Sequence, residues 1–144
     1  MSAKINDASE KARAAKETSD QATALYEQGQ QAFTAKQSNR AVELFEEGLS
    51  VANTDALTAQ ITKAMNAVKD AAVAAAELKL TSGQAALKAH EHSTAIGAYH
   101  SGLAVEALGD EWKAKLTSAS DEARAAKQLH ESALLGYAEG QQAY

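Results

Sequence analysis

The sequence LYEQGQQAF at residues 25–33 has a related copy, YAEGQQAY, at residues 137–144, and both contain GQQA. Extending the comparison towards the N-terminus aligns residues 9–33 with residues 120–144, and twelve of these twenty-five positions are identical. A fainter copy lies between them, because a shift of 54 residues places Gly29 on Gly83 and Phe45 on Tyr99. Self-similarity at a fixed spacing is the signature of a protein built from structural repeats.

The composition favours helix along the whole chain. The 144 residues contain no proline and no cysteine, and the aromatic residues are four tyrosines, two phenylalanines and one tryptophan. Helix-favouring Ala, Glu, Gln, Lys and Leu dominate, whereas the β-branched and aromatic residues typical of strands are few. The length is that of one ordinary domain. We therefore predict a single all-α domain over residues 1–144.

Capping and turn signals divide the chain into five predicted helices, long and short in alternation. Asp7 and Glu10 have the spacing of a capping box at the start of the first helix. Gly109 and Asp110 pair a helix-ending glycine with an N-cap. The predicted helices run from about residue 6 to 36, 40 to 52, 55 to 89, 94 to 107, and 110 to the end.

These helices group into about two and a half hairpins, with repeat units at about 6–53, 55–107 and 110–144, the last one incomplete. Five of the eight glycines fall at repeat-equivalent positions. Because a glycine inside a helix costs about 1 kcal/mol relative to alanine, its recurrence predicts close approach of helices where no side chain fits. The five are Gly29, Gly48, Gly83, Gly102 and Gly140.

The markers in each unit resemble those of the tetratricopeptide (TPR) family of helical-hairpin repeats. They are Gly29, Phe33, Ala41 and Phe45 in one unit, and Gly83, Leu87, Ala95 and Tyr99 in the next. The first helix of each unit carries about twenty residues more than the family repeat of about 34. The chain thus resembles a divergent, long-helix version of the family. The resemblance implies an α-hairpin solenoid of the right-handed type.

The same resemblance implies a concave groove lined by the first helix of each unit. A glutamine recurs there beside an aromatic or aliphatic residue, and such side chains could hold a peptide by amide hydrogen bonds and apolar contacts. The alternative is that these apolar residues are hairpin core and the glutamines are solvated. The groove positions are Tyr26, Gln30, Phe33, Leu80, Gln84, Lys88, Tyr137 and Gln141.

The last predicted helix lacks a polar outer face. It carries Leu134, Leu135, Tyr137 and Tyr144, whereas the end of a repeat array needs a polar cap. Either the chain is part of a longer array, or this end meets another copy and gives an oligomer or filament. A second apolar stripe, which packs inside the molecule or against another chain, comprises Ile61, Met65, Val68, Ala72, Ala75 and Ala76.

Other classes of function find little support in the sequence. Nineteen acidic and fourteen basic residues give a net charge of −5, which disfavours nucleic acid. No apolar run could cross a membrane and no signal peptide begins the chain, so we expect a soluble, intracellular, cytoplasmic protein. His90, His92 and His100 are expected to be turn and surface residues, and His130 to be isolated. We predict no metal site, cofactor or catalytic residues.

Our leading hypothesis is a non-enzymatic helical-repeat scaffold that contacts proteins and self-associates through its long helices and its C-terminal half-repeat. The alternative is a peptide-binding adaptor that uses the Gln/aromatic groove. The partner is in both cases a protein, either another copy of the chain or a peptide segment.

Overall fold

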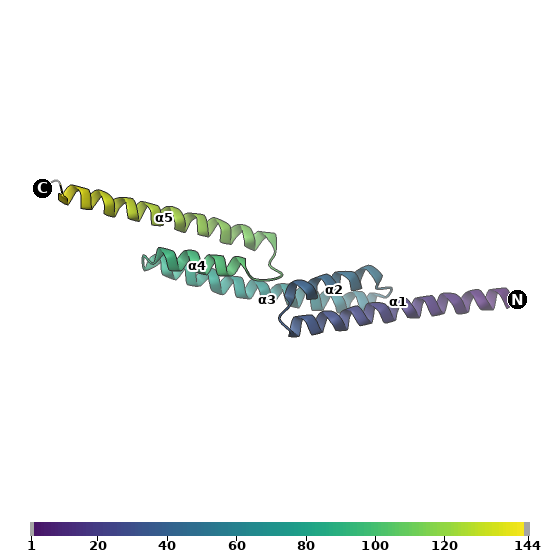
Figure 1. Cartoon of the computed structure of the whole chain (residues 1–144). Helices are drawn as coiled ribbons and strands as arrows, with labels where there is room; N and C mark the ends of the chain where they lie inside the picture. The colour runs from purple at the N-terminus through teal and green to yellow at the C-terminus, as the bar shows by residue number, and fades with distance from the viewer. Residues whose placement is uncertain (1, 143–144) are drawn as a thin grey trace. The chain divides into compact units, whose positions relative to one another are not determined.

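The structure is a computed structural model that describes the backbone of residues 2–142 and the side chains of residues 6–141. The described residues form five α-helices and no β-strand (Figure 1). The expectation of an all-α chain with alternately long and short helices is therefore confirmed. The helices are α1 (Ser2–Thr34), α2 (Ser38–Val51), α3 (Asp55–Lys88), α4 (His92–Leu103) and α5 (Asp110–Gln142).

The contacts within the chain divide it into two units. Unit 1 covers residues 1–71 and unit 2 covers residues 72–144. The boundary falls in the middle of α3, so that helix supplies its first half to unit 1 and its second half to unit 2. Each unit therefore combines one half of α3 with one other long helix and one short helix.

Unit 1 has its core between α1, α2 and the first half of α3. Ala22 comes from α1, Ala41 and Phe45 from α2, and Ile61 and Val68 from α3, and each is at most 1% exposed. Spacings of four residues in α2 and seven in α3 place the residues of each helix on one side of it. The first half of α1 adds little to this core, because residues 6–17 are exposed.

Unit 2 repeats this core. Ala76 comes from α3, Ala95 and Tyr99 from α4, and Leu116 and Ala123 from α5, and each is again at most 1% exposed. Three of them lie 54 residues after buried residues of unit 1: Ala76 follows Ala22, Ala95 follows Ala41, and Tyr99 follows Phe45. The sequence repeat is thus also a repeat of packing positions.

The apolar stripe predicted on α3 is packed inside the two units. Ile61, Val68, Ala72 and Ala76 are buried, and Met65 and Ala75 are half-buried. The hydrophobic effect therefore accounts for these residues within the chain, and the stripe leaves little apolar surface for another molecule.

The repeat-equivalent glycines allow close helix contacts in both units. A Cβ atom on Gly29 would lie 2.6 Å from Cδ1 of Phe45, and one on Gly83 would lie 2.6 Å from Cζ of Tyr99. Gly102 likewise faces Leu116, whose Cδ1 would be 2.9 Å from an added Cβ. These distances are shorter than van der Waals contact, so the aromatic rings rest directly on the glycine backbone. The prediction of close helix approach is confirmed at these three glycines and is wrong at Gly140, where an added Cβ would meet no described atom within 4 Å.

The turns after α1 and α3 share one backbone conformation. After α1, Lys36 N–H donates to Phe33 O (3.0 Å) and Gln37 N–H donates to Ala32 O (2.9 Å). After α3, the same pair of bonds runs from His90 N–H to Leu87 O (3.0 Å) and from Glu91 N–H to Ala86 O (2.9 Å). This pattern is a Schellman motif, in which the residue after the C-cap adopts a left-handed conformation.

Lys36 and His90 are the left-handed residues of these two turns, with φ of 62° and 60°. Glycine is the usual residue there, because a side chain in this conformation approaches the following carbonyl oxygen. The tight turns also shorten the predicted breaks. The short helices start at Ser38 and His92 instead of Arg40 and Thr94, because two bonds of the Schellman motif already reverse the chain.

Two predicted helix starts have different outcomes. The capping box at Asp7 and Glu10 is wrong, because α1 begins at Ser2 and Asp7 lies inside it, 3.5 Å from Lys11 Nζ. The break before α3 is confirmed, and Thr54 caps the helix by accepting the Leu57 N–H at 3.2 Å.

The connection before α5 differs from the prediction. α4 ends at Leu103 instead of Ala107, and Ala107, not Gly109, has a positive φ (62°). Leu108 in this connection is only 6% exposed and belongs to the core of unit 2. Burial of this leucine removes apolar surface from water and so stabilises the connection.

Candidate protein interaction surface

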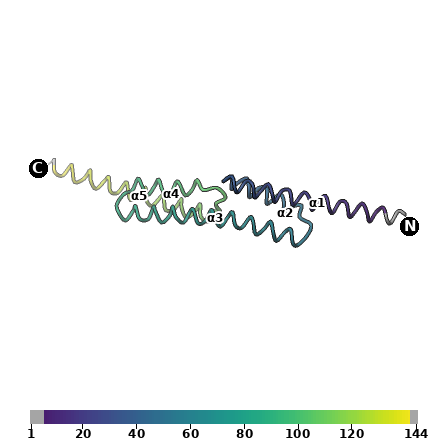
Figure 2. Tube along the Cα trace, turned by 90° about the horizontal axis from the view of Figure 1, so that it is seen from below, coloured from purple at the N-terminus to yellow at the C-terminus, as the bar shows by residue number. Residues whose placement is uncertain are grey.

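The second half of α5 is an exposed helix. Its first half carries the buried residues Leu116 and Ala123, whereas every residue from 128 to 141 is exposed. In unit 2 the C-terminal part of α5 extends beyond the turn between α3 and α4 (Figures 1 and 2). The exposed apolar side chains include Leu129 (73%), Leu134 (55%), Leu135 (63%) and Tyr137 (67%). Such an accumulation on one short segment is typical of an interaction site.

The corresponding half of α1 is covered. Residues 18–30 of α1 align with residues 129–141 of α5 in the sequence repeat. Ala22 and Gly29 are buried beneath α2, whereas Ala133 and Gly140 at the same repeat positions are exposed. An added Cβ on Gly140 would meet no described atom within 4 Å.

The first halves of the two helices show the opposite pattern. Ala123 of α5 is fully buried in unit 2, whereas its repeat equivalent Ala12 of α1 is exposed. In the repeated segment, the second half is therefore covered in α1, and the first half is covered in α5.

Four residues share one side of this exposed half at spacings of four, three and four residues. We call them the α5 line: Leu129, Ala133, Gly136 and Gly140. The equivalent line of α1 is Thr18, Ala22, Leu25 and Gly29, and that of α3 is Ala72, Ala76, Lys79 and Gly83. α2 covers the α1 line and α4 covers the α3 line, as the glycine contacts show.

The predicted groove residues of unit 1 are only partly accessible. Tyr26 is half-buried and its ring lies 6.1 Å from that of Phe45. The Gln30 side-chain amide is exposed and donates to the Tyr26 hydroxyl at 2.6 Å. Phe33 is 37% exposed at the end of α1. Gln30 also borders a shallow hollow with Glu27.

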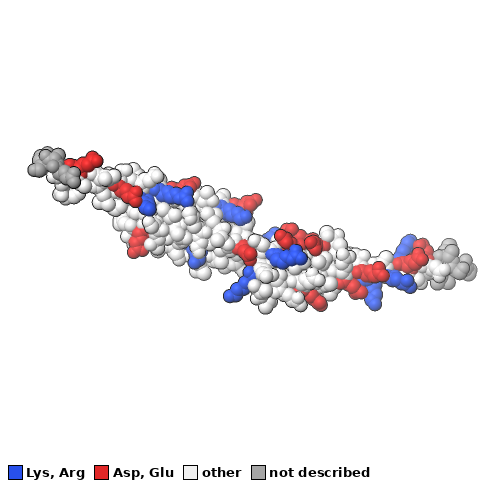
Figure 3. Space-filling view, in the orientation of Figure 1, with Lys and Arg blue, Asp and Glu red and all other residues white. Residues whose placement is uncertain are grey.

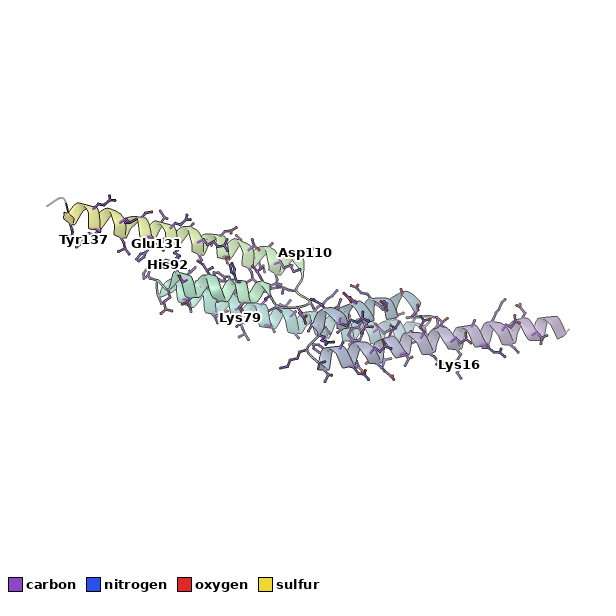
Figure 4. The ribbon with its side chains drawn as sticks, viewed as in Figure 1. Lys16, Lys79, His92, Asp110, Glu131 and Tyr137 are labelled. Atoms are coloured by element: carbon purple, nitrogen blue, oxygen red, sulfur yellow. The ribbon has the colours of Figure 1, made fainter. Side chains whose placement is uncertain are left out.

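The predicted groove residues of unit 2 lie on α3 and α5. Leu80 is half-buried, whereas Gln84 and Lys88 are exposed. On α5, the Gln141 amide donates to the Tyr137 hydroxyl at 2.6 Å, the same bond that joins Gln30 to Tyr26. Tyr137 and Gln141 border a shallow hollow together with Gly136 and Gly140. Figure 4 shows Tyr137 projecting from the exposed end of α5. Whether the eight groove residues act together stays a prediction.

Three of the four residues predicted for self-association lie in the exposed half of α5. Leu134 and Tyr137 lie on the same side of α5 as the residues of its first half that pack on α4. Leu135 points to a different side. Tyr144 lies outside the described residues. Sequence reasoning missed the α5 line itself, although the repeated glycines at positions 29, 83 and 140 indicated it.

Three of the four histidines gather at the turn between α3 and α4. The ring of His92 lies 6.3 Å from that of His90 and 5.3 Å from that of His130, so the prediction that His130 is isolated is wrong. Sequence separation hid this contact, because α5 brings His130 back beside the start of α4. Glu131 lies at the same place, on the side of α5 that faces His92 (Figure 4). His100 instead contacts Arg124 at 2.9 Å.

Among the described residues, no group of three or more His, Cys, Asp or Glu side chains is arranged to hold a metal ion. Acidic and basic side chains are mixed over the visible surface (Figure 3). Burial, and secondarily the Glu122 carboxylate, raise the pKa of Tyr99, a core residue that has no access to a substrate.

No protein-family model, curated protein or solved structure shows a significant match to the chain. Among the described helices, none is long and apolar enough to cross a membrane.

Proposed function

We propose that this protein is a non-enzymatic helical-repeat scaffold that acts by protein–protein contact, with self-association through the exposed half of α5. The observation that carries the proposal is the difference between two copies of one sequence segment. The segment is packed under a short helix in α1 and exposed in α5, with Leu134, Leu135 and Tyr137 at least half exposed. Contact with another protein would remove these apolar side chains from water, which lowers the free energy.

The TPR-like character of the hairpins is part of this proposal. Glycine on the first helix and an aromatic ring on the second meet in both units, Gly29 with Phe45 and Gly83 with Tyr99. The equal Schellman turns at Lys36 and His90 support the same interpretation. A right-handed solenoid arrangement of the repeats is proposed on these grounds.

The available energy suits a modest, concentration-dependent association. Full burial of a leucine or tyrosine side chain contributes about 1.5–3 kcal/mol, and the α5 side chains are already partly covered by their own helix. Association must also offset an entropic cost of at least about 4 kcal/mol. We therefore expect the protein to associate in the micromolar to millimolar range.

Sedimentation velocity and light scattering across that concentration range test the proposal. The mean mass should rise with concentration, and Leu134→Glu should suppress the rise because it places a charge in the contact. Leu78→Glu is the matched control, since Leu78 is 70% exposed on α3 in the same unit and lies outside the proposed surface. A strict monomer at all concentrations, or equal effects of the two substitutions, would reject self-association through α5.

The second candidate function, peptide binding by the groove residues, has one supporting observation. The glutamine-to-tyrosine hydrogen bond recurs in α1 and α5 with the same length, so the amide and ring are held in the same way in both copies. In this function, substituting Gln84 and Tyr26 with alanine should weaken capture of a peptide partner while the helical content is kept. Unchanged capture would remove the groove from consideration.

A further inference from the structure

Unit 1 shows how a short helix covers the line that α5 leaves exposed. Phe45 of α2 rests on Gly29, and Gly48 of α2 lies beside Leu25, whose Cβ would be 3.6 Å from a Cβ at position 48. Ala41, four residues before Phe45, is fully buried. The contact thus uses a small residue, an aromatic ring four residues later, and a glycine three residues after the ring.

Unit 2 repeats this arrangement with different side chains. Tyr99 of α4 rests on Gly83, an added Cβ on Gly102 would lie 3.2 Å from Cβ of Lys79, and Ala95 is fully buried. The pattern of alanine, aromatic ring and glycine is the same as in α2. Two independent copies of the line therefore bind the same kind of helix in the same register.

We infer that the α5 line is a docking site for a third short helix of this kind, supplied by a partner. Its recognition chemistry is a small residue, an aromatic ring four positions later that rests on Gly140, and a small residue three positions after the ring. Gly136 stands where α1 has Leu25 and α3 has Lys79, so the last partner position tolerates a larger side chain than glycine. We rest this inference on the proposed function, because it names the element that the exposed half of α5 contacts.

Geometry at the glycine makes the site selective for an aromatic side chain. With no Cβ on Gly140 and no described atom within 4 Å of that position, a flat ring can lie against the α5 backbone as Phe45 does on Gly29. An extended peptide offers no equivalent row of side chains at helical spacing. The neighbouring Tyr137 is 67% exposed and can contact the incoming ring, as Tyr26 contacts Phe45.

The test places the chain's own short helix on the site. A copy of residues 34–53 is appended after Tyr144, which continues the repeat in register because Phe33 aligns with Tyr144. Tethering gives the appended helix a high effective concentration. Hydrogen exchange should then slow by about tenfold or more for the amides of residues 129–142, because docking suppresses fraying of this helix end.

A pair of glycine substitutions provides matched controls in the extended chain. Gly140→Leu should abolish the added protection, since its side chain occupies the place of the aromatic ring. Gly136→Leu should retain it, since it reproduces the leucine that unit 1 has at this position. Neither added Cβ meets a described atom within 4 Å, so both variants should keep the exchange pattern of residues 72–127. Changing the phenylalanine of the appended copy to alanine should act like Gly140→Leu.

The extended chain is measured at a concentration where sedimentation shows a monomer. Added protection that depends on Gly140 and on the appended phenylalanine supports the site, whether or not the original chain self-associates. No added protection at residues 129–142, or protection that survives Gly140→Leu, would overturn the inference. A constant mass of the original chain at all concentrations would instead reject self-association. The docking site and self-association can therefore be rejected independently.

Discussion

Replacing Gly83 with alanine should destabilise the protein, although alanine is the better helix former. The substitution adds one methyl group near the C-terminal end of α3, where the Tyr99 ring rests on the helix backbone. The new Cβ would lie 2.6 Å from Cζ and 2.7 Å from Cδ1 of that ring. Tyr99 is 1% exposed, so the core around it limits the displacement of the ring.

The magnitude follows from two opposing effects. Alanine in place of glycine inside a helix gains about 1 kcal/mol, whereas forcing a buried side chain to move typically costs about 1–3 kcal/mol, occasionally more. A ring held within van der Waals contact on several sides belongs at the upper end. We expect Gly83→Ala to lower the free energy of unfolding by about 1–2 kcal/mol.

Gly97→Ala is the control for helix propensity. Gly97 lies in α4 of the same unit and is exposed, and an added Cβ would meet no described atom within 4 Å. This substitution should raise the free energy of unfolding by up to about 1 kcal/mol. Urea unfolding followed by circular dichroism measures both variants, and the expected changes have opposite signs.

We also expect an energetic interaction between positions 83 and 99. Tyr99→Leu removes the ring, so adding Gly83→Ala to that variant should cost less than adding it to the original protein. If Gly83→Ala stabilises the protein as much as Gly97→Ala does, or if the two sites prove additive, the close helix contact does not exist.

Three further changes should alter the stability in defined directions. Lys36→Gly and His90→Gly should each raise the free energy of unfolding by about 1 kcal/mol, because they relieve a left-handed conformation, as measured by urea unfolding. Ser120→Ala should raise it by about 1–2 kcal/mol, because the Ser120 hydroxyl is buried without a hydrogen-bond partner in the described structure. The unfolding free energy should fall above pH 10.0, the ordinary pKa of tyrosine, more steeply than in Tyr99→Phe. The unfolded chain loses the phenol proton at that pH while the raised pKa in the fold retains it.

Each of these predictions has a result that contradicts it. Unchanged or lower stability of the two glycine variants would mean that the turns are not left-handed at Lys36 and His90. A loss of stability in Ser120→Ala would show that the hydroxyl has a partner. Identical alkaline profiles for the original protein and Tyr99→Phe would show that the phenol keeps its ordinary pKa in the fold.

Much of the fold could be predicted from the sequence because it depends on local patterns. The absence of proline, the helix-favouring composition and the apolar spacing indicate helices wherever they occur. The close helix approach at Gly29 and Gly83 could be predicted from the recurrence of glycine, whereas the structure identified the aromatic partners, Phe45 and Tyr99. Helix ends were less predictable. The Schellman turns place Lys36 and His90 where glycine is usual, so the residue types do not indicate these turns.

The sequence alone determined that this protein is helical and that glycine, alanine and aromatic residues recur at equivalent positions, since composition and residue spacing are local properties of the chain. Only the tertiary structure decided which copies of a repeated segment are covered. Ala22 and Ala133 occupy the same repeat position, yet the first is buried and the second exposed, because burial depends on whether another helix lies on that side. The contact of His92 with His130 was likewise decided by packing, which joins residues that no sequence spacing relates.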